Sequence, residues 1–338
     1  MVDFIENSVN QDFQPGFVKT SSYRRLIIHM NRSLNLMTAL LLCGSLAGCG
    51  TDSSSSNQSG NTVASGSGPS FTLRVTDAPI DDAVRVVLSF TEVRLRNTNG
   101  NWTTHTFNTP KSIDMLQLQG TKTADLLVDK LVDVGNYDEI RLLVDGAPMA
   151  NYIQDAVGMA ELMIPSGSSS GLKIKGNFSV LENRPASLVM DLDLRQSITM
   201  AGNSGKYILK PVIRLVSDKD AGHIRGTVNP ASLGSMPACS DVDPNTHNAV
   251  YVYAGHNVIP DDIDQGSPQS LAPFATTSIA YDNAIMGFLY EAAFLPAGKY
   301  TVAFTCNADA EDLDDGNDDL KFFDIQNVTV LVSDTLFL

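Results

Sequence analysis

The densest group of side chains that could bind a ligand is an acidic run near the C-terminus. Residues 309–319 hold seven carboxylates within eleven residues. Carboxylates at this density repel one another, and a bound Ca²⁺ relieves the repulsion because it takes oxygen ligands. The calcium hypothesis therefore assigns the ligands Asp309, Asp312, Asp314, Asp315 and Asp318.

The spacing within this run favours a different interpretation. In an EF-hand loop that starts at Asp312, the required glycine would stand at position six, but Gly316 stands at position five. The acidic segment 261–266 fails the same test. A solvated acidic loop is the interpretation that we favour, and the sequence leaves open whether the two segments meet in space.

Two further patterns bear on catalysis. Residues 167–171 match G-x-S-x-G, but that mechanism needs a strand, a tight turn and a helix. Here Pro165 precedes the pattern and a strand-like run follows it, which favours a hairpin loop.

The histidines that follow the first 30 residues, at positions 105, 223, 247 and 256, show no metal-ligand spacing. The sequence therefore predicts a protein that is not an enzyme.

The N-terminal region indicates export. After Arg32, the apolar run 36–45 is too short to cross a bilayer as a helix but suits the core of a signal peptide. The string Leu46-Ala47-Gly48-Cys49 closely resembles the bacterial lipobox. This resemblance implies lipidation of Cys49 and cleavage before it. We assign residues 30–48 to the signal peptide and expect residues 1–29 to reflect an over-extended gene start, with Met30 as the better start.

Residues 49–70 are expected to form a flexible tether. The segment is rich in Ser and Gly and has almost no apolar residue, so it cannot bury enough surface to offset the entropy of ordering. Lipidation of Cys49 would anchor the chain by its acyl chains, so the membrane is an expected partner. Lipoproteins retained at the inner membrane tend to carry Asp after the lipidated cysteine, and Gly50 stands there instead. We therefore expect an envelope protein, with the outer membrane favoured.

Two cysteines remain after export and lipidation, Cys239 and Cys306. In an oxidising compartment they are most simply interpreted as one disulfide. The alternative, a pair of ligands for a soft metal, lacks neighbouring ligands at the required spacing.

Charge is distributed unevenly along the chain. Residues 71–217 hold 15 Lys and Arg against 16 Asp and Glu, whereas residues 218–338 hold 4 against 18. The acidic half would be repelled by nucleic acid and by anionic lipid, so the sequence excludes nucleic acid as a partner. A protein or polysaccharide ligand is compatible with this pattern.

Apolar residues alternate with polar ones through most of the chain, which predicts two antiparallel β-sandwich domains at 71–217 and 222–338 and a mainly β fold. A change of phase predicts a bulge near Thr91 in the second strand. The acids of residues 188–194 alternate with apolar residues, which predicts a sheet with one solvated face. Residues 207–215 are expected to form one strand, and residues 124–132 a helical turn or two.

An ordered series of motifs resembles a known family. The series includes Thr76-Asp77-Ala78-Pro79, Gly135-Asn136-Tyr137 and Met190-Asp191-Leu192-Asp193, and it ends at Lys206–Val212. It looks like the bacterial lipoprotein domain named domain of unknown function 4382, over about residues 71–216. The resemblance implies a β-sandwich exposed in the envelope and transfers no catalytic residue.

The second domain is similar to another class of sandwich. Ile224–Val228 and Leu295–Val302 resemble prealbumin-like and carboxypeptidase-regulatory-like domains, in which a Pro/Gly turn leads into a strand whose first Tyr packs inward. Gly135-Asn136-Tyr137 repeats this arrangement in the first domain. We therefore expect an envelope-anchored lipoprotein that presents two β-sandwich modules for binding or envelope structure. A calcium-dependent adhesion module and a hydrolase of envelope polymers are the alternatives.

Overall fold

The computed structural model describes residues 69–78, 80, 83–201, 206–228, 247–263, 271–285, 287–313 and 318–338. All of them belong to one compact unit, residues 62–338. The signal peptide, Cys49, most of the tether, Cys239, Asp314 and Asp315 lie outside the described residues. In the part of the chain that is described, no helix is long and apolar enough to cross a membrane.

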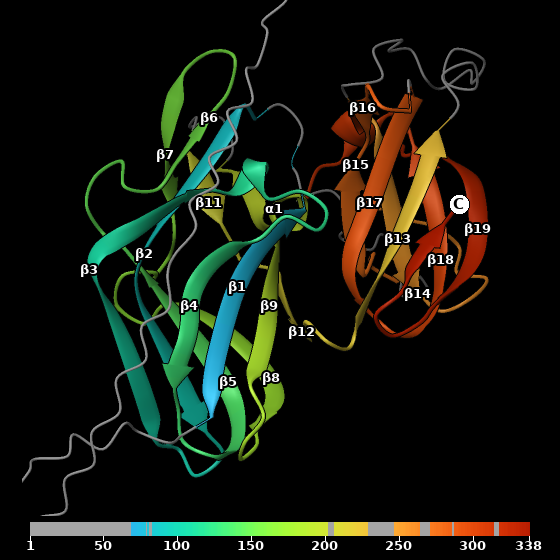
Figure 1. The fold of residues 1–338 in the computed structure, drawn as a ribbon. Helices are drawn as coiled ribbons and strands as arrows, with labels where there is room; N and C mark the ends of the chain where they lie inside the picture. The colour runs from blue at the N-terminus through green and yellow to red at the C-terminus, as the bar shows by residue number, and fades with distance from the viewer. Residues whose placement is uncertain are drawn as a thin grey trace, which may run out of the picture. The chain divides into compact units, whose positions relative to one another are not determined.

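The described residues form a mainly β protein, as the alternation predicts (Figure 1). Its elements, in chain order, are β1 Ser70–Ala78, β2 Arg85–Asn97, β3 Trp102–Asp114, η1 Met115–Gln117, β4 Ala124–Leu131, β5 Gly135–Val144, β6 Tyr152–Gln154, β7 Met159–Met163, β8 Leu172–Val180, β9 Ala186–Asp193, α1 Leu194–Ser197, β10 Ile198–Met200, β11 Tyr207–Leu209, β12 Ile213–Ser217, β13 Ala221–Val228, β14 Ala249–Ala254, β15 Ala275–Ser278, β16 Ala280–Asp282, β17 Gly287–Pro296, β18 Gly298–Thr305, η3 Ala308–Ala310, β19 Phe322–Val330 and β20 Thr335–Phe337.

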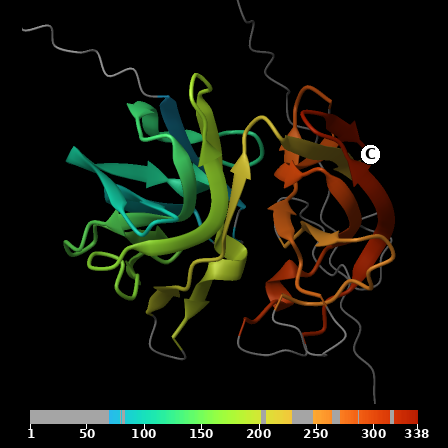
Figure 2. The same ribbon diagram turned by 90° about the horizontal axis from the view of Figure 1, so that it is seen from below.

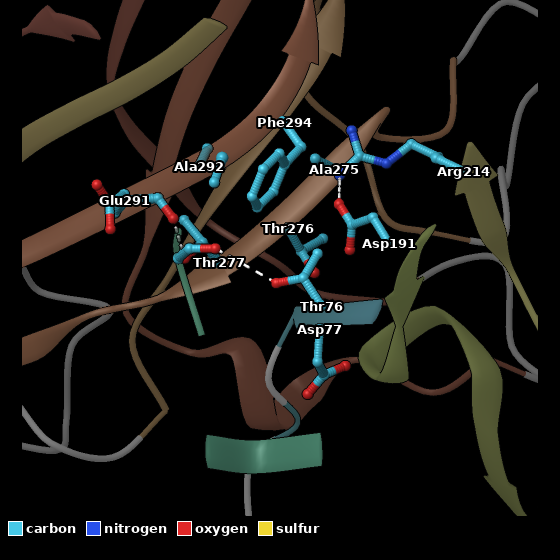
Figure 3. A pocket seen from close by; sticks show the side chains of 12 residues that line it. Thr76, Asp77, Asp191, Arg214, Ala275, Thr276, Thr277, Glu291, Ala292 and Phe294 are labelled. Atoms are coloured by element: carbon cyan, nitrogen blue, oxygen red, sulfur yellow. Dashed lines mark hydrogen bonds and ion pairs between the residues drawn. The ribbon is translucent and has the colours of Figure 1, made fainter. Parts of the chain in front are cut away.

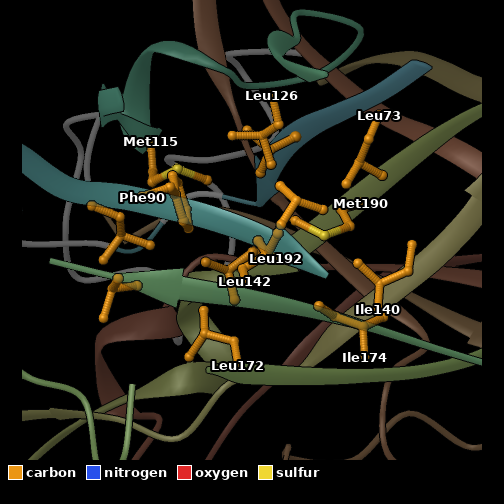
Figure 4. Close-up of a cluster of buried hydrophobic side chains, with 14 of the residues drawn as sticks. Leu73, Phe90, Met115, Leu126, Ile140, Leu142, Leu172, Ile174, Met190 and Leu192 are labelled. Carbon is orange, nitrogen blue, oxygen red and sulfur yellow. The ribbon is translucent and has the colours of Figure 1, made fainter. Parts of the chain in front are cut away.

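The first sandwich consists of two sheets. One has the strand order β12-β9-β1-β4, and the other has the order β10-β11-β7-β6-β2-β5-β8, with β3 paired to β2. Their facing apolar side chains form one core, which Figure 4 shows from within. Leu73 of β1 and Met190 of β9 contribute from one sheet, and Ile140 of β5 and Ile174 of β8 contribute from the other. The core therefore holds together strands that are far apart in sequence.

The second sandwich is smaller. One sheet has the order β16-β17-β13-β20 and the other has the order β15-β14-β18-β19 (Figure 2). A second core lies between them, with Ile224 and Tyr290 from one sheet and Val252 and Val302 from the other. Most pairs are antiparallel, as predicted, but β1–β9, β7–β11 and β13–β20 are parallel.

The predicted bulge in β2 is confirmed. The register of β2 against both β3 and β5 shifts between Phe90 and Glu92, so that Val93 and Leu95 continue on the core side. The bulge bends the strand without exposing its apolar residues.

Two local predictions are wrong. Residues 124–131 form the strand β4 and not a helical turn, because pairing with β1 and burial of Leu126 and Leu127 outweigh the helical spacing of Leu127 and Leu131. The predicted strand 207–215 is two strands, β11 and β12, which lie in different sheets. Pro211 between them has no N–H to donate to a ladder, so the chain leaves one sheet there and enters the other.

A third prediction, the solvated face of β9, is also wrong. Asp191 is 4% exposed and Asp193 is 2% exposed. The polar side of this strand is covered by the second sandwich, whose Ala293 and Phe294 pack against Val189 of β9. Polar and apolar residues do alternate along β9, but the polar side chains face the second sandwich and not water.

The same tyrosine arrangement occurs once in each sandwich. Tyr137 of β5 is buried, and its hydroxyl donates a hydrogen bond to the Asp133 carbonyl at 2.8 Å. Tyr300 of β18 is buried in the other core and donates to the Pro296 carbonyl at 2.7 Å. Each hydroxyl bonds the backbone four residues upstream, in the manner of the tyrosine corner of immunoglobulin-like sandwiches. The arrangement fixes the bend by which the chain enters each strand.

We expect Tyr137→Phe and Tyr300→Phe each to lower the free energy of unfolding by about 1 kcal/mol, because each leaves a partly buried carbonyl without its donor. The two losses should add in the double variant, since the hydroxyls lie in different cores. Denaturation in urea measures both. Tyr281→Phe, at a tyrosine that is 45% exposed, is the matched control and should change little. An unchanged midpoint in both corner variants would contradict this role.

Candidate functional site

A buried carboxylate links the two sandwiches. Asp193 ends β9 and caps α1, where its Oδ1 accepts from the Gln196 backbone N–H at 3.1 Å. The same carboxylate accepts from Thr276 of β15, whose backbone N–H lies 3.2 Å from Oδ2 and whose hydroxyl lies 3.1 Å from both oxygens. Asp193 and Thr276 are both buried. One side chain therefore satisfies donors from both sandwiches.

Charged neighbours surround this link. Arg214 of β12 forms an ion pair with Asp191 through Nη2, and its guanidinium carbon lies 4.7 Å from the ring centre of Phe274. Arg195 of α1 donates from Nη2 to the Ser278 hydroxyl at 3.4 Å. Arginine can make such contacts because its planar cation both pairs with carboxylates and stacks on aromatic rings.

A loop of the first sandwich also reaches across the junction. Thr76 holds the loop through its hydroxyl, whose oxygen lies 2.8 Å from the carbonyl oxygens of both Leu118 and Lys122. At the tip of the loop, the Thr121 backbone N–H donates to Oε2 of Glu291 in β17 at 3.2 Å. The junction is therefore made by side chains and backbone from several elements.

The cavity at this junction is small (Figure 3). It has a volume of about 10 Å³ and is lined by Thr76, Asp191, Arg214, Thr276 and Glu291, among others. This volume holds about one water molecule. At this volume, the cavity between these side chains holds water and not an organic substrate.

Burial changes the acidity of the carboxyls at the junction. It raises the pKa of Asp77 and of Asp193, and the nearby Asp191 carboxylate raises both further. The Gln196 N–H opposes this effect at Asp193, because a donor stabilises the ionised form.

The two acidic segments of the second sandwich do meet in space. The backbone N–H of Ile263 donates to Oε1 of Glu311 at 3.1 Å, and the backbone N–H of Asp318 donates to Oδ2 of Asp262 at 3.3 Å. Hydrogen bonds between backbone N–H groups and carboxylates thus hold the loops together and offset part of their mutual repulsion.

Among the described carboxyls of these loops, Glu311 has a clearly shifted pKa. The Tyr251 hydroxyl donates to its Oε2 at 2.7 Å, and the side chain is partly buried. Burial raises the pKa of Glu311 to about 7, against the opposing effects of the Tyr251 and Ile263 donors. The group therefore titrates near neutral pH.

The predicted calcium ligands are only partly described. Asp309 lies 3.9 Å from Nδ1 of His247, and Asp312 is exposed while its backbone N–H donates to Oδ2 of Asp318 at 2.5 Å. Within the described ranges, no three His, Cys, Asp or Glu side chains are grouped so that they could hold a metal ion. Because Asp314 and Asp315 lie outside those ranges, the calcium hypothesis stays a prediction.

Cys306 and Ser169 are two further residues that the sequence singles out. Cys306 is buried after β18, and because Cys239 lies outside the described residues, their disulfide stays a prediction. Ser169, the central serine of the G-x-S-x-G match, donates its hydroxyl to the Ser166 carbonyl within its own turn at 3.3 Å. The strand β8 follows this turn, which confirms the loop interpretation.

The histidines are dispersed. His223 accepts from the Phe294 backbone N–H at 3.2 Å, and His256 bonds the Val328 carbonyl at 2.8 Å through Nε2. His105 lies on β3, where burial lowers its pKa. His247 has its carboxylate neighbour in Asp309, whose side chain is 47% exposed.

Sequence reasoning missed the junction residues. The sequence marks Asp191 and Asp193 by their alternation and as part of a family motif, but neither signal predicts a junction, and Thr276 and Arg214 carry no signal of their own. The helix-capping pattern of an Asp three residues before Gln196 was the one local cue that Asp193 has a structural role.

Comparison with known proteins supports one part of the family resemblance. Residues 69–211 match the model of a family described as Domain of unknown function (DUF4382), so the chain contains a domain of this family. No curated protein sequence matches this chain. Structures of two variants of the major pilin of Streptococcus pyogenes align at 10% and 11% identity, over 80% of this chain and 100% of theirs, with TM-scores of 0.17 and 0.16. Scores this low carry no argument about the fold.

We expect Thr276→Val to loosen the junction. Valine keeps the shape of the side chain but removes the hydroxyl that donates to Asp193. Loss of a hydrogen bond to a buried carboxyl should lower the free energy of unfolding by roughly 1–3 kcal/mol. Hydrogen exchange should speed up at the Gln196 amide in the first sandwich, because that amide shares the same acceptor.

Thr277→Val is the matched control for this experiment. Its hydroxyl is also buried but donates to the Glu291 carbonyl at 3.1 Å, within the second sandwich. It should destabilise the second sandwich without changing exchange at Gln196. Equal exchange at Gln196 in both variants would show that the hydroxyl of Thr276 does not stabilise the junction.

The raised pKa of Glu311 predicts a pH dependence of stability. The folded state retains a proton that the unfolded chain loses above its ordinary pKa of 4.5, so stability should fall as pH rises from about 4.5 to about 7. Glu311→Gln should flatten that slope and be the more stable form at pH 8. Thermal melting across this range measures it, with Asp312→Asn as the control for one lost charge. An unchanged slope in Glu311→Gln would refute the assignment.

Proposed function

We propose that this chain is a lipid-anchored protein of the bacterial envelope that presents two β-sandwich modules, as one joined unit, for binding. The observation that carries the proposal is the closed junction. Asp193, the centre of the polar cluster most like a catalytic site, already accepts hydrogen bonds from Gln196 and Thr276, and the cavity beside it measures about 10 Å³. This arrangement supports a structural role for the cluster, and leaves the outer faces for recognition.

The anchor rests on the N-terminal sequence. The lipobox at Leu46–Cys49 and the Ser/Gly-rich tether that follows would hold the folded unit away from the membrane surface. Gly50 after the lipidated cysteine favours the outer membrane.

The second module is proposed to be prealbumin-like. Tyr300 packs inward after the turn at Pro296–Gly298, which is the arrangement expected of that class. The protein is proposed to be non-enzymatic, with a hydrolase as the rival class. The rival needs a histidine and a buried carboxylate at one cleft, whereas His247 has an exposed carboxylate as its neighbour.

Labelling with palmitate in cells tests the anchor. Cys49→Ser should give an unprocessed precursor that incorporates no label, because the thiol that forms the thioether is gone. Cys43→Ser, six residues earlier in the apolar run, is the matched control and should be processed and labelled normally. Labelling of the Cys49→Ser protein would rule out the anchor.

A further inference from the structure

A row of cations crosses the outer face of the larger sheet in the first sandwich. Arg94 of β2 lies directly opposite Arg141 of β5, which lies directly opposite Lys173 of β8. Their neighbours along each strand, such as Leu95 and Leu142, are buried in the core, so the row faces outward. We call Arg94, Arg141 and Lys173 the cationic row.

Such a row costs stability in the absence of a partner. Like charges directly opposite one another on neighbouring strands, about 4.8 Å apart, destabilise a sheet. Glu92 and Glu139 pair with the two arginines along their own strands and offset part of this cost. Lys175 lies opposite Glu139 and adds a further cation to the same face. Although the chain has a net charge of −15, the neighbouring cations Arg94, Arg96, Arg141, Lys173 and Lys175 outnumber the carboxylates Glu92, Asp138 and Glu139 beside them.

The arginines at this face are held in place before any ligand arrives. Glu139 is buried, and it accepts from Nε of Arg141 at 2.6 Å while its other oxygen lies 3.1 Å from Nη2 of Arg96. Asp138 accepts from Nε of Arg96 at 2.8 Å. Because these long side chains are already ordered, an anion that binds them loses less side-chain entropy.

The sole tryptophan of the chain stands beside the row. Trp102 of β3 lies opposite Arg96, is 38% exposed, and has the guanidinium carbon of Arg141 at 4.5 Å from its ring centre. It places an apolar ring edge next to fixed cations. A ligand that matches both features carries carboxylates on apolar-faced rings.

We propose that this face binds a carboxylated polysaccharide, which is the ligand class that the proposed binding function then takes. Carboxylates would bind the cationic row, and a sugar ring would pack against Trp102. A membrane surface or a nucleic acid presents denser negative charge, which the acidic second sandwich repels more strongly. A polymer with at most one charge on each ring is repelled less by the acidic second sandwich, so it fits the face better.

Binding to polygalacturonate tests the proposal, with neutral dextran and phosphatidylglycerol vesicles as the other arms. The full chain carries Cys49→Ser in every arm so that no acyl chain contributes, and vesicles without phosphatidylglycerol measure the binding that the uncleaved apolar run 36–45 adds. We expect binding to polygalacturonate alone, and weaker binding as salt rises. Arg94→Gln with Lys173→Gln should weaken it tenfold or more, the effect of losing a charge-assisted hydrogen bond.

The matched control is Lys122→Gln with Lys299→Gln, which removes the same charge from exposed positions that belong to neither the row nor its strands. It should bind like the parent. Trp102→Leu keeps every charge and should also weaken binding, which a purely electrostatic attraction would not predict. Equal weakening in the row and control variants, binding to vesicles in place of polygalacturonate, or no binding to polygalacturonate would each overturn the proposal. None of these outcomes depends on palmitate labelling, so the lipid anchor and the polysaccharide ligand are tested independently.

Discussion

The joined structure depends on the carboxylate of Asp193. A buried carboxyl is costly unless donors surround it, and Asp193 takes its donors from α1 and from Thr276 of the other sandwich. Neither sandwich alone would satisfy this group in a water-free environment. The link therefore favours one arrangement of the two sandwiches. Separating them would take the Thr276 donors away from the Asp193 carboxylate, which water would then have to solvate.

The surroundings of Asp193 combine polar and apolar contacts. Val189, Val216 and Phe294 form a small apolar cluster that excludes water beside the link, while Arg214 pairs with Asp191. Exclusion of water strengthens the hydrogen bonds inside and raises the pKa of the buried carboxyls. Water is not excluded from the outer face of β2 and β5. The ion pairs there stay partly exposed and remain available to an anion from solution.

The two sandwiches use one local device in different cores. Each places a tyrosine at the start of a strand and bonds its hydroxyl to a carbonyl four residues upstream. The device depends on a short stretch of chain, so it is visible in the sequence as a glycine two residues before Tyr137 and before Tyr300. It fixes a bend locally while the packing around each ring differs.

The sequence by itself determined most of the strands, the bulge beside Glu92 and the inward packing of Tyr137 and Tyr300, because each depends on side chains within a few residues of one another. Only the tertiary structure decided which faces meet water. The acids of β9 alternate as on a solvated strand, yet the second sandwich buries them, and the strand β4 replaces an expected helical turn because β1 pairs with it. Contact between the acidic segments at Ile263 and Glu311 likewise joins residues 48 positions apart. Periodicity shows that a strand has two faces, but what covers each face depends on elements distant in the chain.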